Sequence, residues 1–273
     1  MKSLKFAEAE GVEIAKEYGV SSIADLRKLP GDKFIPNVWT IPGTWPIIDG
    51  YVIPDDQYNL YEAGKYNDIP VLIGYNSDEG ASFPIGRTPE EFISQVKTRF
   101  GKFADTLLSV YPLTENSVPK SARDLSRDAA FGWHTWSWAR LQSETGKSKV
   151  YYYYFDQHPD YPKDSPQYGY GSPHGQDVPY VFMTLDPSNP NTTASDLKLS
   201  KIMGTYWTNF AKFGNPNGQS VPEWTAFSNQ HPDAMYLSGS EPFMGTIPSE
   251  KSLQVLNAYF KWRRTLEYQE GKD

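Results

Sequence analysis

Cysteine is absent from all 273 residues of the sequence. Its absence excludes disulfide bonds, thiolate zinc sites, iron–sulfur clusters and a cysteine nucleophile. The absence of cysteine does not indicate a particular cellular compartment.

Basic residues are fewer than acidic residues. The sequence has 26 Lys and Arg residues against 33 Asp and Glu residues, which gives a formal net charge of -7. Such a chain offers no general positive field to nucleic-acid phosphates or anionic lipid headgroups, so we expect no nucleic-acid partner. No apolar run approaches the roughly 18 residues of a membrane span. The longest run, Val150 to Phe155, has the length of a strand.

Motifs that bind cofactors and metals are missing as well. Neither a Walker-type loop nor a G-x-G-x-x-G motif follows any predicted strand. No two histidines have the i, i+4 spacing of a zinc hydrolase. We therefore expect neither a cofactor nor a metal ion.

Aromatic residues, by contrast, are abundant, with 19 Tyr and 8 Trp in a chain that is 38% hydrophobic and 22% charged. This composition is that of a folded globular protein with a sizeable core. We favour an interpretation in which the rings fill an irregular core and keep their polar tips at its edge. Rings that line a pocket, or that lie coplanar on one exposed face as in a carbohydrate-binding module, are the alternatives.

Hydrophobic periodicity predicts a chain in which helices and strands alternate. The strands are short apolar runs bounded by helix breakers, which is typical of strands buried on both faces. The pattern favours an α/β fold, a mostly parallel sheet with helices on both faces, and no linker divides the chain. Ligands of such sheets bind beyond the carboxyl ends of the strands. The predicted helices span residues 4–18, 22–30, 89–107, 126–145, 195–213 and 249–267, and the predicted strands span 71–74, 150–155 and 235–237.

The first candidate functional segment, Asn76 to Gly80, directly follows a predicted strand. A carboxylate in such a turn is well placed to accept a hydrogen bond from a histidine ring. A solvated acidic turn without function is the alternative.

The second candidate segment is the loop from Gly171 to Asp177, where glycines at 171 and 175 flank His174. These glycines allow the loop to bend and present the ring, and Asp177 lies close enough in sequence to support it. The other three histidines are weaker candidates. We expect His134 to pack among tryptophans on a helix, and His158 and His231 to be exposed in polar loops.

Five stretches of the sequence resemble motifs of the type-B carboxylesterases, a family that includes para-nitrobenzyl esterases, cholinesterases and some lipases. The first two stretches resemble the segment that carries the acidic member of the catalytic triad. The third resembles the histidine motif HG-x-[DE]-[LIV]-P-[FY]-V-F, and the last two resemble the family's late W-x-x-F-A-x-x-G-x-P-N and W-P-like segments. In chain order they are Trp45–Pro54, Pro70–Gly80, His174–Phe182, Trp207–Asn217 and Val221–Trp224.

The resemblance implies an α/β-hydrolase fold and the hydrolysis of a small carboxylic ester. It assigns Glu79 as the triad acid and His174 as the general base. The family's aromatic residue in the wall of the acyl pocket, four positions after the acid, corresponds to Phe83. We expect a carboxylate oxygen of Glu79 to lie about 2.6–3.2 Å from a ring nitrogen of His174.

The family's nucleophile motif, G-x-S-x-G, is missing. Ser82 comes nearest to this motif, but Pro84 occupies the position of the second glycine. In addition, Ser82 follows Glu79 in the chain, whereas the family's nucleophilic serine precedes the acid. The HGGG-type oxyanion loop is absent too. The sequence therefore resembles the C-terminal half of a single α/β-hydrolase domain, and residues 1–273 alone are expected to be inactive. A complementary N-terminal half that carries the serine is the expected partner.

A non-catalytic binding or adhesion protein on the same fold is the alternative function. Such proteins lose the serine and bind their partners through their surface. The presence of both Glu79 and His174 favours descent from a working hydrolase, because a binding protein needs neither.

Overall fold

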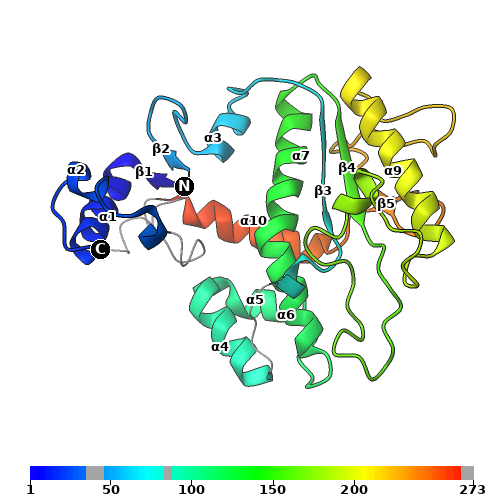
Figure 1. Cartoon of the computed structure of the whole chain (residues 1–273), viewed down its shortest axis with the longest axis horizontal. Coiled ribbons are helices and arrows are strands. Elements are labelled where there is room, and N and C mark those ends of the chain that lie inside the picture. Colours follow the sequence, from blue (N-terminus) through cyan, green and yellow to red (C-terminus); the bar gives the residue numbers. More distant parts are fainter. Residues whose placement is uncertain (35–45, 83–87, 266–273) are drawn as a thin grey trace. The chain divides into compact units, whose positions relative to one another are not determined.

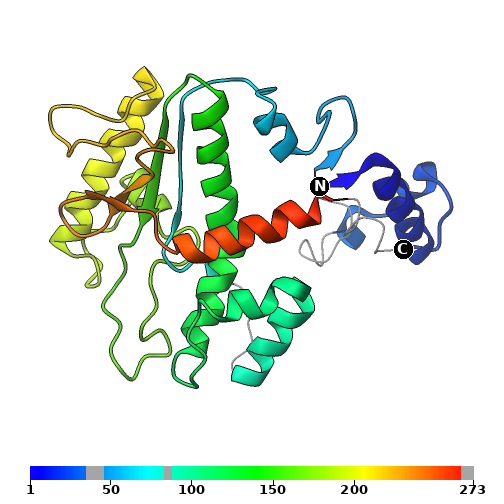
Figure 2. The ribbon, with the colours of Figure 1, turned by 180° about the vertical axis from the view of Figure 1, so that it is seen from behind.

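A computed structural model describes residues 1–34, 46–82 and 88–265. The chain forms two compact units, Met1–Tyr66 and Asn67–Asp273, so the single domain expected from the sequence remains a prediction. Figures 1 and 2 show the ribbon from two opposite sides.

The first unit is built on α1, which begins where the sequence predicted a helix. The hydroxyl of Ser3 caps this helix by accepting a hydrogen bond from the Phe6 backbone N–H. Ser22 caps the short α2 in the same way. The elements of this unit are β1 (Lys2–Ser3), α1 (Leu4–Glu17), α2 (Ile23–Leu26), the 3₁₀ turn η1 (Gly31–Phe34), β2 (Ile47–Ile48), which pairs parallel to β1, and α3 (Gln57–Glu62).

The second unit contains a sheet with strand order β3-β4-β5-β6. The first three strands are parallel, and β6 runs antiparallel to β5 at one edge. The sequence predicted the three parallel strands, although β3 and β5 are two residues longer than expected, and it did not predict β6. The strands are β3 (Val71–Asn76), β4 (Val150–Phe155), β5 (Asp233–Leu237) and β6 (Phe243–Thr246).

Helices cover both faces of this sheet, as predicted (Figures 1 and 2). Helix α7 lies against β3 and β4 and also contacts α10, while α9 packs on the opposite face. The helices and turns of this unit are η2 (Glu79–Ser82), α4 (Pro89–Phe100), η3 (Gly101–Phe103), α5 (Ala104–Leu108), α6 (Val118–Arg127), the π-helical turn η4 (Asp128–Gly132), α7 (Trp133–Thr145), α8 (Val178–Val181), α9 (Ala194–Phe213) and α10 (Glu250–Arg263). None of the helices in the described parts of the chain combines the length and apolarity needed to cross a membrane.

Four predicted helices differ from those in the structure. The helix expected over 89–107 ends at Phe100, and the 3₁₀ turn η3 separates α4 from α5. The helix expected over 126–145 begins earlier, at Val118, and the turn η4 interrupts it where the pattern of buried positions changes. Helix α9 is capped by Thr193 instead of Ser195, because Thr193 and Asp196 form a complete capping box. Helix α10 ends at Arg263, before the expected residue 267.

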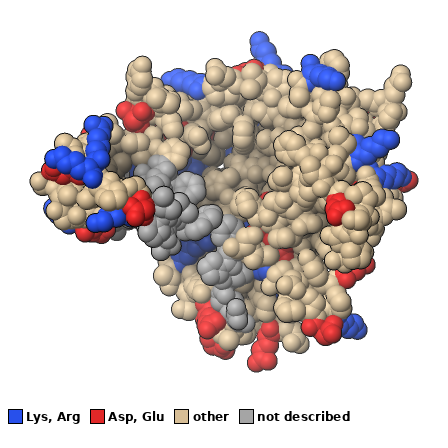
Figure 3. Space-filling view, in the orientation of Figure 1, with Lys and Arg blue, Asp and Glu red and all other residues tan. Residues whose placement is uncertain are grey.

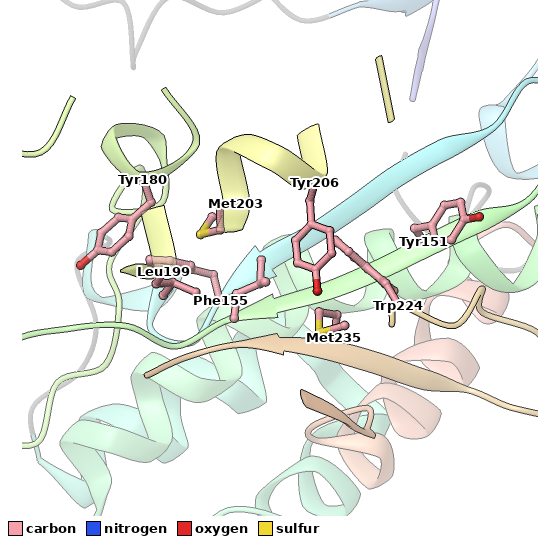
Figure 4. Close-up of a cluster of buried hydrophobic side chains, with 9 residues drawn as sticks. Tyr151, Phe155, Tyr180, Leu199, Met203, Tyr206, Trp224 and Met235 are labelled. Carbon is pink, nitrogen blue, oxygen red and sulfur yellow. The ribbon is translucent and has the colours of Figure 1, made fainter. Parts of the chain in front are cut away.

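The main hydrophobic cluster lies between α9 and the sheet (Figure 4). Its aromatic rings meet edge to face: the Tyr206 and Trp224 rings lie 5.1 Å apart, and the Phe155 and Tyr180 rings also lie 5.1 Å apart. Many of the abundant aromatic residues therefore lie in the core, as favoured from the composition. The nine buried members are Tyr151, Phe155, Tyr180, Leu199, Met203, Tyr206, Trp224, Met235 and Leu237.

Charged side chains of both signs lie scattered over the face shown in Figure 3. Among the described residues visible there, no continuous basic area gathers over any element. This distribution agrees with the weak field expected from the net charge.

The glycine at position 80 allows η2 to pack directly on α6. A Cβ atom at Gly80 would lie 2.0 Å from the carbonyl oxygen of Arg123, which is backbone and cannot rotate away. We predict that Gly80→Ala lowers the free energy of unfolding by about 3 kcal/mol, measured by urea denaturation. Gly11→Ala is the matched control, because Gly11 lies in α1 with open space around it and alanine favours a helix by up to about 1 kcal/mol. Equal effects of the two substitutions would contradict the close packing at Gly80.

Candidate active site

The structure brings together the two segments that the sequence singled out. Strand β3 ends at Asn76, and the chain turns at once into η2, which begins with Glu79. The loop after β4 returns to the same place, because the Ser77 backbone N–H donates to the Phe155 carbonyl and the Asp78 N–H donates to the Ser172 carbonyl, both at 2.9 Å. The candidate site therefore lies beyond the carboxyl ends of β3 and β4, as expected for a parallel sheet.

Glu79 and His174 form a direct hydrogen bond. The Nδ1 atom of His174 lies 2.6 Å from Oε2 of Glu79, which is within the range predicted from the sequence. The other carboxylate oxygen, Oε1, accepts the backbone N–H of Asn76 at 2.9 Å. A carboxylate acceptor at Nδ1 keeps the proton on that nitrogen, so the lone pair of Nε2 is left to act as a base.

The two partners differ sharply in exposure. The Glu79 side chain is 6% exposed, whereas the His174 side chain is 59% exposed. Burial raises the pKa of Glu79, and the hydrogen bonds from Asn76 and His174 oppose that rise. The pair thus consists of a buried acid that holds an open histidine ring, the arrangement that a general base needs to reach a substrate.

Phe131 flanks the histidine on another side. Its ring centroid lies 5.2 Å from that of His174, with the two planes tilted by 40°. Phe131 belongs to the π-helical turn η4, whose extra residue shifts the positions of the side chains that follow α6. Sequence reasoning missed this contact, because a wide turn inside a helix leaves no sign in the hydrophobic period.

Asp177 lies near the site and forms hydrogen bonds with residues of β3 and β4. Its Oδ1 atom accepts from Nδ2 of Asn76 at 3.2 Å, and its Oδ2 atom accepts from the Tyr153 hydroxyl at 3.4 Å. Asp177 therefore fixes the end of the histidine loop to Asn76 and to β4. Phe83, the expected pocket residue, lies outside the described residues.

Two buried arginines of α6 also approach the turn. Arg123 pairs with Asp78, and Arg127 donates to the Ser77 carbonyl at 2.8 Å. The sequence analysis missed both arginines. Both arginines lie on the side of α6 opposite its buried apolar residues, so the hydrophobic period marks them as surface residues.

The remaining histidines lie elsewhere. His134 contacts the rings of Trp133 and Phe260 but is exposed, so the expected packing among tryptophans is met only in part. His231 is exposed, as expected, whereas the expectation for His158 was wrong, because its side chain is partly buried next to Asp156. Over the residues that the structure describes, no three His, Asp or Glu side chains gather as they would around a metal ion.

Comparisons with known proteins identify the family. The model of the carboxylesterase family matches residues 4–256, so the chain belongs to the carboxylesterase family. The chain is 29% identical to the fumonisin B1 esterase of Sphingopyxis macrogoltabida, over 92% of this chain and 48% of that protein. It is 31% identical to human neuroligin-2, over 69% of this chain and 25% of that protein.

Solved structures show the same α/β-hydrolase fold. A para-nitrobenzyl (PNB) esterase matches 77% of this chain and 43% of its own with a TM-score of 0.60 and 26% identity. A thermophilic PNB esterase matches 89% of this chain and 52% of its own with a TM-score of 0.70, and its 23% identity supports the fold alone. The chain spans about half the length, or less, of these relatives.

The raised pKa of Glu79 predicts a pH-dependent effect on stability. The folded state binds the Glu79 proton more tightly than the unfolded chain, so ionisation of this carboxyl group destabilises the fold. Relative to a Glu79→Gln variant, the protein should lose stability as the pH rises from the ordinary value of 4.5 through the higher folded-state pKa. Urea unfolding of both proteins across this window measures the difference. A gain in relative stability with rising pH would show that the hydrogen bonds lower the pKa of Glu79 more than burial raises it.

Proposed function

We propose that this chain supplies the acid and the general base of a Ser-Glu-His triad in a carboxylic-ester hydrolase. Glu79 holds His174 in the Nδ1–H tautomer and stabilises the imidazolium that forms. His174 takes the proton of a serine hydroxyl as the serine attacks the ester carbonyl, and then returns it to the leaving alcohol. In the second half of the reaction water takes the place of the alcohol: His174 accepts a proton from the water that attacks the acyl-serine and returns it to the leaving serine oxygen. The 2.6 Å contact between Glu79 and His174 is the observation that carries this proposal.

The serine of this triad comes from another polypeptide segment in our proposal. Two observations support it: the sequence has no G-x-S-x-G elbow, and the chain spans about half of its esterase relatives. Exposed apolar side chains next to the histidine loop agree with a surface that a further segment covers, since water disfavours them. Val178, Phe182 and Met183, at the two ends of α8, are 51%, 70% and 60% exposed.

A small-molecule ester is the proposed substrate class. The family supports it, and so does the open position of His174 beyond the sheet. The wall of the acyl pocket is assigned to Phe83 by the same proposal.

The second candidate function is a non-catalytic binding protein on the same fold. The missing serine agrees with it, and one matched relative, neuroligin-2, is not named as an esterase. A buried carboxylate aligned on an open histidine has no use in such a protein, so we favour the hydrolase.

Activity measurements separate the two candidates. The isolated chain should hydrolyse a p-nitrophenyl acyl ester no faster than its His174→Ala variant. Co-expression with the elbow-bearing half should give turnover that falls about a million-fold in His174→Ala and about ten-thousand-fold in Glu79→Ala, as expected for residues of a triad.

His231→Ala is the matched control, because His231 is an exposed histidine in a distant loop and its loss should leave turnover unchanged. No turnover after a stable complex has formed would favour the binding protein. Hydrolysis by the isolated chain that depends on His174 would instead require a nucleophile within these 273 residues.

A further inference from the structure

The three residues that precede Glu79 all bind the loop that carries His174. Asn76 donates from Nδ2 to the Pro173 carbonyl at 2.8 Å. Ser77 accepts the Ser172 N–H on its hydroxyl oxygen at 2.8 Å. Asp78 accepts the Gly171 N–H on Oδ2 at 3.0 Å. The turn therefore fixes the backbone of the histidine loop at three consecutive points, and Glu79 then meets the ring.

Arg123 joins the same two segments from the side of α6. Its Nε atom lies 3.0 Å from each carboxylate oxygen of Asp78. A terminal nitrogen of the same guanidinium donates to the Gly169 carbonyl at 3.1 Å, and the group lies 4.0 Å from the centre of the Tyr170 ring. One buried cation thus contacts both the turn before Glu79 and the loop before His174.

The turn before Glu79, the loop before His174 and helix α6 are packed too closely to shift relative to one another. A Cβ atom at Gly171 would lie 2.4 Å from the hydroxyl oxygen of Ser77, and a Cβ at Gly80 would lie 2.0 Å from the Arg123 carbonyl. The side chains of Asp78 and Arg123 are 5% and 7% exposed. Water therefore has little access to replace their hydrogen bonds.

We propose that Asp78 and Arg123 are positioning residues that hold His174 in register with Glu79. This inference rests on the proposed function, in which the Glu79–His174 bond sets the tautomer. In the described part of the chain, the His174 ring has Glu79 as its hydrogen-bond partner, contacts the Phe131 ring and is otherwise largely open. With few contacts on the ring, its alignment depends on the loop backbone, which Asp78 and Arg123 fix at residues 169 and 171.

A purely structural role explains this ion pair less well. Burying a carboxylate and a guanidinium costs solvation, and a well-packed apolar pair in their place is often as stable or more stable. An apolar pair cannot accept the Gly171 N–H or donate to the Gly169 carbonyl. Stability and alignment of the histidine can therefore be separated by experiment.

The test follows the histidine tautomers by NMR in the full chain labelled with ¹⁵N-histidine. The four histidines make the spectrum simple, and a His174→Gln variant assigns the signals. At a pH where the ring is neutral, we expect His174 to be a single Nδ1–H tautomer. The double variant Asp78→Leu/Arg123→Met should keep a cooperative urea transition but lose this single state, giving a mixture of tautomers. Arg123→Lys, which keeps the charge but loses the contact with Gly169, should show a smaller loss.

Two controls separate alignment from general destabilisation. Leu125→Ala removes a buried side chain of the same helix and none of these hydrogen bonds, so it should lower stability and keep the Nδ1–H tautomer. Glu79→Gln reports what the spectrum shows when the carboxylate itself is lost.

Each outcome decides the proposal. A single Nδ1–H tautomer in both the double variant and Arg123→Lys would overturn it, and would leave the proposed esterase function standing. A mixture of tautomers already in the unsubstituted chain would overturn the Glu79–His174 assignment along with it. If the double variant does not fold, the test rests on Arg123→Lys alone. A mixture of His174 tautomers in this variant would support the proposal, and a spectrum identical to that of the unsubstituted chain would refute it.

Discussion

The hydrogen-bonded junction between the turn at residues 76–79 and the loop at residues 169–174 is the constraint on which the candidate site depends. Both segments follow parallel strands, so the sheet alone brings them to the same edge. The sheet does not set their distance to the accuracy of a hydrogen bond. That accuracy comes from backbone contacts, the small glycines and the buried cation of Arg123, which together fix the position of one segment relative to the other.

The same constraint explains the contrast between the acid and the base. Glu79 is buried because η2 packs on α6, and burial raises its pKa. His174 stays open because its loop is held mainly by hydrogen bonds to the loop backbone, and only Glu79 and Phe131 are described in contact with the ring. A rigid loop can therefore present an exposed base, whereas a ring aligned by tight packing would be closed to a substrate. The π-helical turn adds Phe131 to one side and leaves the rest of the ring accessible.

Membership of the carboxylesterase family fits a chain in which a buried carboxylate and an exposed histidine share a hydrogen bond. The parts that the motifs indicate, the acid and the histidine, are those that the sheet edge brings together. The relatives that match are about twice as long or longer, and we propose that a further segment completes the site. The exposed apolar residues at α8 lie next to the histidine loop, where that segment is proposed to bind.

The sequence by itself determined the alternation of helices and strands, the three parallel strands and the two candidate segments, because each depends on local periodicity or on neighbouring residues. It did not reveal the antiparallel β6, the π-helical turn or the burial of Arg123 and Asp78. These depend on which surfaces meet in three dimensions. A buried arginine looks like a surface arginine in a sequence, since only tertiary packing removes its water and places a carboxylate and a carbonyl around it. The residues of the site could thus be identified from the sequence, whereas the contacts that hold them in place depend on the tertiary structure.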